Sequence, residues 1–307
     1  MHTFEISVGR ERLARNGKGG IMKNKNVLIT GGTSGMGKGA AMRLAKLGAR
    51  LLLVGHNQSK GEAALADIIA TSGNERVAYA RADLSVLAEM RRLAEFTRVH
   101  FDRLDALVHA AGGVFPSKRL LTEDGVEFSF ALQFLARFVL TGELYEQLVV
   151  AADPKVVSLA GGGTVSGELD FDNLNGETGY RWHRAIAKDA RANDLLTLEQ
   201  IDQYPGITFY NYGPGFVLTN TVMRNAAARI FFKTLARPLT RSPESAADDI
   251  VMLLTGDYPS GLYDKRLQRN DPPIWADEAA RKRLWDYGIQ LATRTAQEPA
   301  KPVSAET

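Results

Sequence analysis

The chain of 307 residues contains no cysteine, which excludes disulfide bonds, thiolate catalysis and cysteine-ligated zinc. Its first residues contain no continuous apolar stretch of the kind found in a secretory signal. No run approaches the roughly 18–20 apolar residues that a transmembrane helix needs. A basic stripe with interleaved aromatic residues is also missing, so nucleic acid is not an expected partner. These absences favour a cytoplasmic protein that has neither a membrane nor a nucleic-acid partner.

What is present is ordinary for a globular protein, with 45% hydrophobic and 24% charged residues. The net charge is +3, and residues 1–21 supply +2 of it, so the remainder is about neutral. Residues 1–21 are polar and rich in glycine, and the hydrophobic pattern starts only after Met22, a candidate natural start. We therefore expect a flexible N-terminal arm over 1–21, a folded domain over 22–295 and a flexible tail over 296–307.

Short β-rich runs alternate with longer helical patterns, which is typical of a parallel sheet with crossover helices. The expected strands span 26–30, 50–54, 76–80, 104–109, 155–159 and 207–212, with a short last strand at 261–263. The expected helices span 38–47, 61–70, 86–100, 126–148, 183–198 and 246–254. No internal repeat or linker splits the body, so the sequence predicts one doubly wound α/β domain.

A glycine-rich turn, Thr-Gly-Gly-Thr-Ser-Gly-Met-Gly at residues 30–37, directly follows the first expected strand. In the order strand, turn and helix, such glycines let the backbone approach a pyrophosphate at the positive end of the helix. The alternative is an ordinary surface turn, but the flanking elements favour a dinucleotide site. The expected fold is therefore a Rossmann-type parallel sheet of about seven strands flanked by helices, in a single domain.

From about Asn24 to Tyr263 the chain resembles the short-chain dehydrogenase/reductase family, especially its retinol-dehydrogenase-like branch. Beyond the glycines, the resemblance rests on these segments: residues 83–84, 109–112, 171–174, 214–219 and 260–263. It implies that residues 83–84 contact the adenine and that residues 214–219 hold the nicotinamide amide. The implied cofactor-binding residues are Gly31, Thr33, Ser34, Gly35, Met36, Gly37, His56, Asp83, Leu84, Ala110, Ala111, Gly112, Pro214, Gly215, Val217 and Thr219.

The end of the second expected strand bears on the choice of cofactor. A carboxylate there would bond the ribose hydroxyls of NAD, but Gly55 and His56 occupy these positions. His56 falls where NADP-using relatives place Arg, and Lys38 and Lys60 lie near in sequence. The alternative is that His56 is an ordinary surface residue. We expect NADP(H) rather than NAD(H).

The family's catalytic residues are missing from the matching positions. Family members use a Tyr general acid, a Lys four residues later, a Ser after the fifth strand and a relay Asn. The aligned positions hold Ile186, Ala190, Gly161 and Gln133 respectively. A Tyr-x-x-x-Arg pair at 180 and 184 does not fit this register. Because a positioned general acid typically contributes about 10²–10⁴ in rate, ordinary carbonyl reduction by the family mechanism is not expected.

Other polar residues could replace the missing groups. His183 and Asp189 lie three residues to either side of Ile186, which predicts one shared face toward the substrate cleft. Lys188 is expected to point away from that face, and Arg137 to be a solvated or interface residue. Tyr212 ends the sixth strand, at the sheet edge where ligands bind. The candidate catalytic residues are His183, Asp189, Tyr212, Gln133 and Tyr180; each has a purely structural alternative.

Two functions remain open. The first is an NAD(P)-binding enzyme that acts on a small, largely apolar metabolite by other chemistry, as an atypical oxidoreductase or a non-redox cyclase or isomerase. The second is a catalytically inactive dinucleotide-binding or regulatory protein. A polar cleft around Gln133, His183 and Tyr212 would favour the enzyme, and an apolar, filled one the binding protein. The family resemblance also implies a homodimer or homotetramer built through the two long helices after the fourth and fifth strands.

Overall fold

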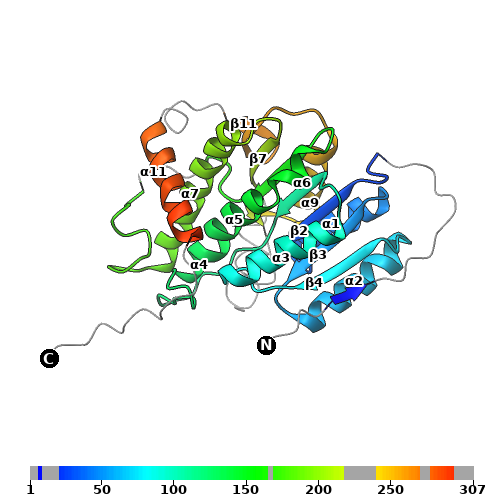
Figure 1. Cartoon of the computed structure of the whole chain (residues 1–307), viewed down its shortest axis with the longest axis horizontal. Coiled ribbons are helices and arrows are strands. Elements are labelled where there is room, and N and C mark those ends of the chain that lie inside the picture. The colour runs from blue at the N-terminus through cyan, green and yellow to red at the C-terminus, as the bar shows by residue number, and fades with distance from the viewer. Residues whose placement is uncertain (1–5, 9–20, 165–168, 218–239, 270–276, 294–307) are drawn as a thin grey trace.

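The computed structural model describes residues 6–8, 21–164, 169–217, 240–269 and 277–293. Nine strands form one sheet in the order β1-β4-β3-β2-β5-β6-β7-β10-β11 (Figure 1). The strands are β1 (Ile6–Val8), β2 (Asn26–Thr30), β3 (Arg50–Gly55), β4 (Val77–Arg81), β5 (Ala106–His109), β6 (Lys155–Leu159), β7 (Thr208–Gly213), β10 (Gly261–Asp264) and β11 (Leu267–Arg269). The seven strands from β4 to β10 are parallel, whereas the edge strands β1 and β11 pair antiparallel. The predicted seven-stranded parallel sheet is confirmed and carries an extra strand at each edge.

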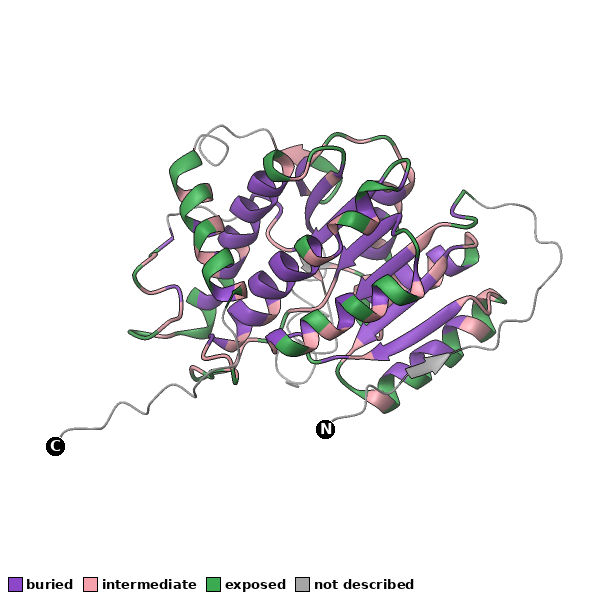
Figure 2. Ribbon diagram, viewed as in Figure 1, coloured by how far each residue is buried: buried purple, intermediate pink, exposed green. Residues whose placement is uncertain are grey.

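Helices cover both faces of this sheet. They are α1 (Gly35–Lys46), α2 (Gln58–Ser72), α3 (Leu87–His100), α4 (Phe128–Phe130), the π-helix η1 (Ala131–Leu135), α5 (Ala136–Glu143), α6 (Tyr145–Val149), α7 (Trp182–Gln203), α9 (Pro243–Thr255) and α11 (Glu278–Ala292). Successive strand residues point to opposite faces, so Leu28 joins the core under α3, α5 and α7, while Val27 and Ile29 join the core under α1, α2 and α9. Figure 2 shows the resulting buried strands and inner helix faces.

Two of the expected elements differ in the structure. Ile6–Val8 pairs with β4, so the prediction of a flexible arm over 1–21 is wrong for these three residues. The helix expected over 126–148 is divided by the π-turn η1 and by a break at Leu144, where the backbone leaves helical geometry two residues after the weak helix former Gly142. A second sheet of two short strands, β8 (Phe216–Val217) and β9 (Thr240–Arg241), was not expected. The tail at 296–307 lies outside the described residues.

Helix α11, which sequence patterning missed, lies along α7 (Figure 1). Its Trp285 ring lies 4.8 Å from the ring of Phe138 in α5 and 5.7 Å from that of Tyr204 at the end of α7. The helix approaches closely at Gly288, where an added Cβ would come within 2.7 Å of the Phe138 ring. A dimer through the faces of α5 and α7 that α11 covers would have to displace this helix. The expected oligomer through the two long helices remains a prediction.

Candidate functional site

The glycine turn lies between β2 and α1, next to the loop that follows β5. At Gly31, φ is +66° and an added Cβ would lie 2.6 Å from the Ala110 backbone. At Gly37, an added Cβ would lie 2.4 Å from the Gly31 carbonyl oxygen. Any larger residue at these two positions would push the loops apart. By contrast, the space beside Gly35 is open, with no atom within 4 Å of an added Cβ.

The first turn of α1 suits an anion. Ser34 is the N-cap, its side chain caps no backbone N–H, and no acidic residue stands in the first turn. These N–H groups therefore have no acceptor from the helix or its cap, and they coincide with the positive end of the helix. Thr33 packs its side chain against Gly55 of β3, which fixes the turn over the sheet. Together with the open space beside Gly35, this cradle fits a dinucleotide pyrophosphate.

The other cofactor positions surround the same crevice, where the strand order reverses between β2 and β5. Asp83 is exposed after β4, and its carboxylate accepts two bonds from Ser85, which fixes its orientation. The backbone of Ala111 donates to the Thr30 hydroxyl (3.3 Å), which joins the loop after β5 to the glycine turn. The remaining predicted positions within the described residues are Met36, Leu84, Gly112, Pro214, Gly215 and Val217. Thr219 lies outside the described residues.

The residues that favour NADP are only partly arranged for it. His56 is exposed just after β3, at the expected position. Lys38, in contrast, is neutralised by an ion pair with Asp67 of α2 (2.6 Å). Lys60 is exposed in the first turn of α2, where its backbone N–H is capped by Asn57. Of these two lysines, only Lys38 has an ion pair among the described residues, so Lys60 is the one available to a cofactor phosphate.

The positions assigned by alignment to the family's Ser, Tyr and Lys lie together in space. A Cβ added to Gly161, after β6, would lie 3.0 Å from the Cβ of Ala190 in α7. Ile186 lies one turn earlier on α7 and is 38% exposed. Hydrogen and alkyl groups stand at these three positions, so none of them offers a proton.

Gln133, at the relay position, connects the loop after β5 to α7. It lies in η1, and π-turns of this kind are frequent at functional sites. Its side-chain amide donates to the Asp189 carboxylate (3.2 Å), and its oxygen accepts from the Gly113 backbone N–H (3.4 Å). Two of the predicted candidates, Gln133 and Asp189, are thus brought together.

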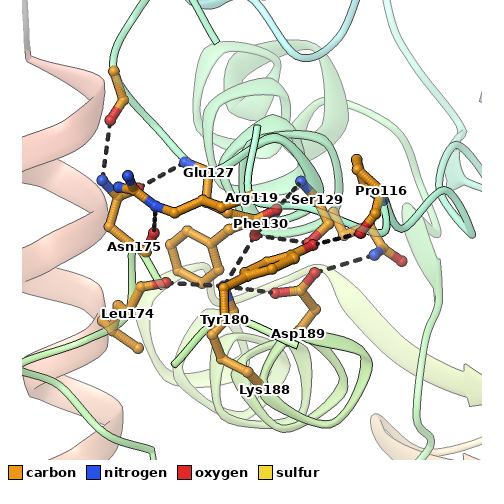
Figure 3. Close-up of polar contacts among 12 residues, drawn as sticks. Pro116, Arg119, Glu127, Ser129, Phe130, Leu174, Asn175, Tyr180, Lys188 and Asp189 are labelled. Carbon is orange, nitrogen blue, oxygen red and sulfur yellow. Dashed lines mark hydrogen bonds and ion pairs between the residues drawn. The ribbon is translucent and has the colours of Figure 1, made fainter. Parts of the chain in front are cut away.

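Lys188 points into this network, so the expectation that it points away is wrong. Its ammonium lies 3.1 Å from Glu127, 3.4 Å from Asp189 and 2.9 Å from the Leu174 carbonyl oxygen (Figure 3). Glu127 is fully buried and caps α4 by accepting from Ser129. The side of α7 at Lys188, which was expected to face solvent, therefore faces the buried carboxylates of Glu127 and Asp189.

Two buried carboxylates share the one ammonium of Lys188. Burial raises the pKa of Asp189 to about 6, with a further rise from Glu127 and a partial offset from Lys188. One oxygen of Asp189 has no hydrogen-bond partner among the described residues. The network therefore contains one carboxyl group that exchanges its proton near neutral pH.

Tyr180 forms the outer edge of the network. Its hydroxyl donates to the Pro116 carbonyl oxygen (3.0 Å), and burial, with the nearby Glu127 and Asp189, raises its pKa (Figure 3). Tyr180 is therefore held as a neutral phenol that connects the loop after β5 to the segment before α7. It stands near Gln133 and Asp189, as a hydrogen-bond donor rather than as an acidic group.

His183 does not join this site. It is exposed and packs edge-to-face on Trp182 (centroids 5.8 Å apart), whereas Asp189 is buried beside Gln133. The prediction that His183, Ile186 and Asp189 share one face is wrong. At 3.6 residues per turn, positions three before and three after Ile186 diverge by about 60° in opposite directions.

Tyr212 also lies elsewhere. Its hydroxyl donates to Asp249 of α9 (2.8 Å) and accepts from Arg241 (3.1 Å). Burial and the Asp249 carboxylate raise the pKa of Tyr212 well above its ordinary value. Strand alternation turns this side chain toward α1 and α9, away from α7, so the assignment of Tyr212 to the substrate cleft is wrong.

Arg137, expected at the surface, is 2% exposed. Its guanidinium donates to the Asn193 side chain (2.7 Å) and to the Leu159 carbonyl oxygen (2.6 Å). Burial lowers its pKa to about 10. It links α5 to α7 and to the end of β6, so it is a structural group behind the site. The prediction of a solvated or interface residue is wrong because buried acceptors on two elements meet there.

Sequence reasoning missed Asp194, which lies one turn beyond Ala190 on α7. Its Oδ1 accepts from the Gly163 backbone N–H (3.1 Å) and from the Asn211 side chain (2.9 Å). Its Oδ2 is buried without a partner among the described residues, and burial raises its pKa to about 7. Asp194 thereby holds the turn that contains Gly161. The available signal in the sequence was one charged residue, Asp194, within the otherwise uncharged run 192–198.

The described ranges contain neither a membrane-spanning helix nor a metal-binding cluster. No helix there is long and apolar enough to span a bilayer. No group of three or more His, Asp or Glu side chains in that part of the chain is arranged to hold a metal ion.

A doubly wound parallel sheet with a glycine cradle at its switch point defines a dinucleotide-binding α/β protein. The profile of the short chain dehydrogenase family matches residues 25–168. The chain is 32% identical over 287 residues to a candidate daunorubicin C-13 ketoreductase, DnrU, of Streptomyces sp. (strain C5), with 91% of this chain and 96% of that protein covered. The chain therefore belongs to the short-chain dehydrogenase/reductase family, whose members bind NAD(P)(H).

Two further comparisons agree with this assignment. Human retinol dehydrogenase 13 is 32% identical over 279 residues, which cover 87% of this chain and 84% of the human protein. A crystal structure of an uncharacterised protein from Mycobacterium paratuberculosis superposes with a TM-score of 0.70 at 22% identity, over 90% of this chain and 96% of the other. At that identity, the structural likeness supports the fold alone.

Proposed function

We propose that this protein is an NADP(H)-binding enzyme that acts on a small, largely apolar molecule without the family's Ser, Tyr and Lys. The observation that carries the proposal is the contact between Gly161 and Ala190 next to Ile186. The alignment assigns the three catalytic groups to these positions, and the structure brings the positions together. An alignment error would not be expected to bring them into contact.

Exposed apolar residues on two neighbouring segments support an apolar substrate. The loop after β5 is joined to the segment before α7 by the Tyr180 bond to Pro116 and by a bond from Arg119 to the Asn175 carbonyl oxygen (2.8 Å). The exposed large hydrophobic residues on these segments and on the start of α7 are Val114, Leu120, Leu121, Trp182 and Ile186. Such a concentration of exposed apolar side chains is typical of a surface that binds an apolar ligand.

The residues present suit hydrogen bonding better than rapid proton donation. NADPH, held by the glycine cradle and the α1 N-terminus, would supply a hydride. The chain itself offers the Gln133 amide and the Tyr180 hydroxyl as hydrogen-bonding groups, and the Asp189 carboxyl as a proton-exchanging group behind Gln133. Preorganised hydrogen bonds in a site sheltered from water favour an atypical reduction, or a non-redox cyclisation or isomerisation.

The relatives support a substrate that carries a carbonyl or an alcohol. One is named for a ketone reduction at C-13 of daunorubicin and the other for retinol. One name specifies a ketone and the other an alcohol. We extend this class to the present chain, together with a cytoplasmic location and a homodimer or homotetramer.

The second candidate function is an inactive protein that binds or senses the dinucleotide. It is favoured by the positions of His183 and Tyr212, of which one is solvent-exposed and the other is bonded to Asp249. A cleft lined by Gln133, His183 and Tyr212, the arrangement that would distinguish the enzyme, is not formed. The two functions share the cofactor site and differ only in turnover.

The first experiment is a titration of NADPH and NADH, followed by quenching of tryptophan fluorescence and by thermal stability. Tighter binding of NADPH supports the cofactor assignment, whereas no binding of either at millimolar concentrations overturns the proposal. Turnover is then measured with ketones and alcohols of the retinoid and polyketide types. Substrate conversion by the wild-type protein selects the enzyme, and binding without conversion selects the inactive protein.

A restored variant tests the alignment itself. Ile186→Tyr with Ala190→Lys and Gly161→Ser places the family's three groups at positions that contact one another. We expect this variant to gain NADPH-dependent ketone reduction by about 10²-fold or more over wild type. Ile186→Phe with Ala190→Met and Gly161→Ala is the matched control, with similar volumes and no functional groups. Equal rates in the two variants would contradict the register.

A further inference from the structure

A cavity of about 330 Å³ lies on the other side of α7 from Ala190, under the segment 169–181. Its lining includes one acidic residue and four basic ones: Asp170, Arg181, Arg184, Lys188 and Arg191. The volume is at the lower end of the range for small-molecule sites. We call this feature the α7 cavity.

The walls of the α7 cavity are held in place by bonds that involve no ligand. Asn173 exchanges two hydrogen bonds with the backbone of Thr178 (2.9 and 3.1 Å), which closes the loop. The guanidinium of Arg184 lies beside Gly179, with Nη1 3.7 Å from an added Cβ there. The basic side chains therefore surround a preformed space.

The acidic residues near the cavity leave two of its arginines without an ion pair. Asp170 accepts a backbone bond from Asp172, and Asp172 itself pairs with Arg283 outside the cavity (3.2 Å). Lys188 is paired with Glu127 and Asp189. Within the described ranges, Arg181 and Arg184 line the cavity without a carboxylate partner, so their guanidinium groups are available to an anion.

Arg191 gives the second, independent observation. Its side chain is 8% exposed, and its Nε and Nη1 are buried without any hydrogen-bond partner among the described residues. Its Nη2 lies 3.6 Å from the Asp277 carboxylate, too far for a hydrogen bond. A buried guanidinium with so few partners is costly unless an anion completes its surroundings.

We propose that the α7 cavity binds the oxyanion group of a small metabolite, a phosphate monoester or a carboxylate. Arg184 and Arg191 contact the oxyanion, and Arg181 adds charge at the edge. Arginine suits this role because its planar fork donates two parallel bonds to such groups. The site lies apart from the glycine cradle and borders the network of Gln133 and Asp189 through Tyr180 and Lys188. The proposal holds whether or not the protein is catalytic.

The test measures binding of inorganic phosphate and of succinate by calorimetry, with chloride at the same ionic strength as the reference. We expect saturable binding of at least one anion by wild type, and phosphate against succinate decides between the two sources. Arg184→Gln should weaken binding by about 10- to 100-fold, the effect of losing a charge-assisted bond. Arg283→Gln removes the same charge from an exposed site outside the cavity and should change binding less than 2-fold.

Arg191→Met separates ligand binding from a structural role. If Arg191 serves an anion, the variant keeps or gains thermal stability without anion and loses the anion-dependent rise in melting temperature. If Arg191 is instead a structural partner of Asp277, the variant is destabilised and the anion-dependent rise survives. That second result, or equal effects of phosphate, succinate and chloride on wild type, overturns the proposal.

Discussion

Asp194→Asn tests whether a buried charge lies behind Gly161 and Ala190. A pKa of about 7 in the folded protein, against an ordinary value of 3.8, corresponds to ~4 kcal/mol that favours the protonated form. The folded state therefore binds this proton more tightly than the unfolded state does. Stability from Asp194 is fully present below pH 3.8 and is lost as the pH rises through about 7.

Asparagine cannot ionise, so the variant escapes this loss. The free energy of unfolding of Asp194→Asn minus that of wild type should rise by ~1.4 kcal/mol per pH unit between pH 4 and 7, then level off. The amide keeps an oxygen for the bonds from Gly163 and Asn211. Its new N–H groups add a constant cost, which cancels in the comparison across pH.

The assay is urea denaturation of both proteins at pH 4.5, 6 and 8. Asp249→Asn is the control, because Arg241, Arg266 and Tyr212 bond its carboxylate and hold its pKa below 3.8. It should lose a constant amount of stability between pH 5 and 8. The reasoning is refuted if the difference in unfolding free energy between Asp194→Asn and wild type varies by less than about 1 kcal/mol over the three pH values. Burial would then not disfavour the charged form of Asp194.

Three further predictions rest on single contacts. Gly31→Ala should abolish detectable NADPH binding, since its Cβ meets backbone at 2.6 Å. At Gly35 an added Cβ has open space and the cost is the strain of a non-glycine residue at φ +52°, so Gly35→Ala should weaken binding by no more than about 10-fold; fluorescence titration distinguishes the two variants. Gly288→Ala should lower the free energy of unfolding by about 1–3 kcal/mol, because the methyl group overlaps an aromatic ring, and calorimetric melting would show it; an unchanged melting temperature would contradict the tight packing of α11. Lys188→Met should lower the free energy of unfolding by about 3–5 kcal/mol at pH 8 and by less at pH 5, because it leaves the buried carboxylates of Glu127 and Asp189 without their cation. Urea denaturation measures this loss, and a loss that does not depend on pH would contradict the shared ammonium.

The inner strands could be predicted because their residues are buried on both faces and form nearly continuous apolar runs. β2 and β6 have the predicted bounds. The glycine turn after β2 predicted where the cofactor would bind along the sheet. The edge strand β1 could not be predicted, because three residues within a polar segment carry no period of their own. Its place depends on the free edge of β4, a tertiary feature.

The candidate site was predicted in position but not in orientation. The register that placed Gly161 at the family's Ser position and Ala190 at its Lys position agrees with their contact, and Gln133 and Asp189 do meet. Tyr212 failed because the sequence does not reveal which face of a fully buried strand looks toward α7. Lys188 failed because its direction is set by Glu127, 61 residues away in the chain. Both errors concern long-range partners, which local periodicity does not encode.

The position of α11 imposes an order on biosynthesis. During translation, strands β2 to β10 emerge before residues 278–292. Until α11 has been synthesised, the aromatic rings of Phe138 and Tyr204 lack their contacts with Trp285. Exposed aromatic surface of this kind makes a nascent chain prone to aggregation until α11 docks. A chain truncated before Glu278 therefore keeps most of the fold but exposes the aromatic rings that α11 covers. We expect such a chain to be bound by chaperones or degraded by proteases.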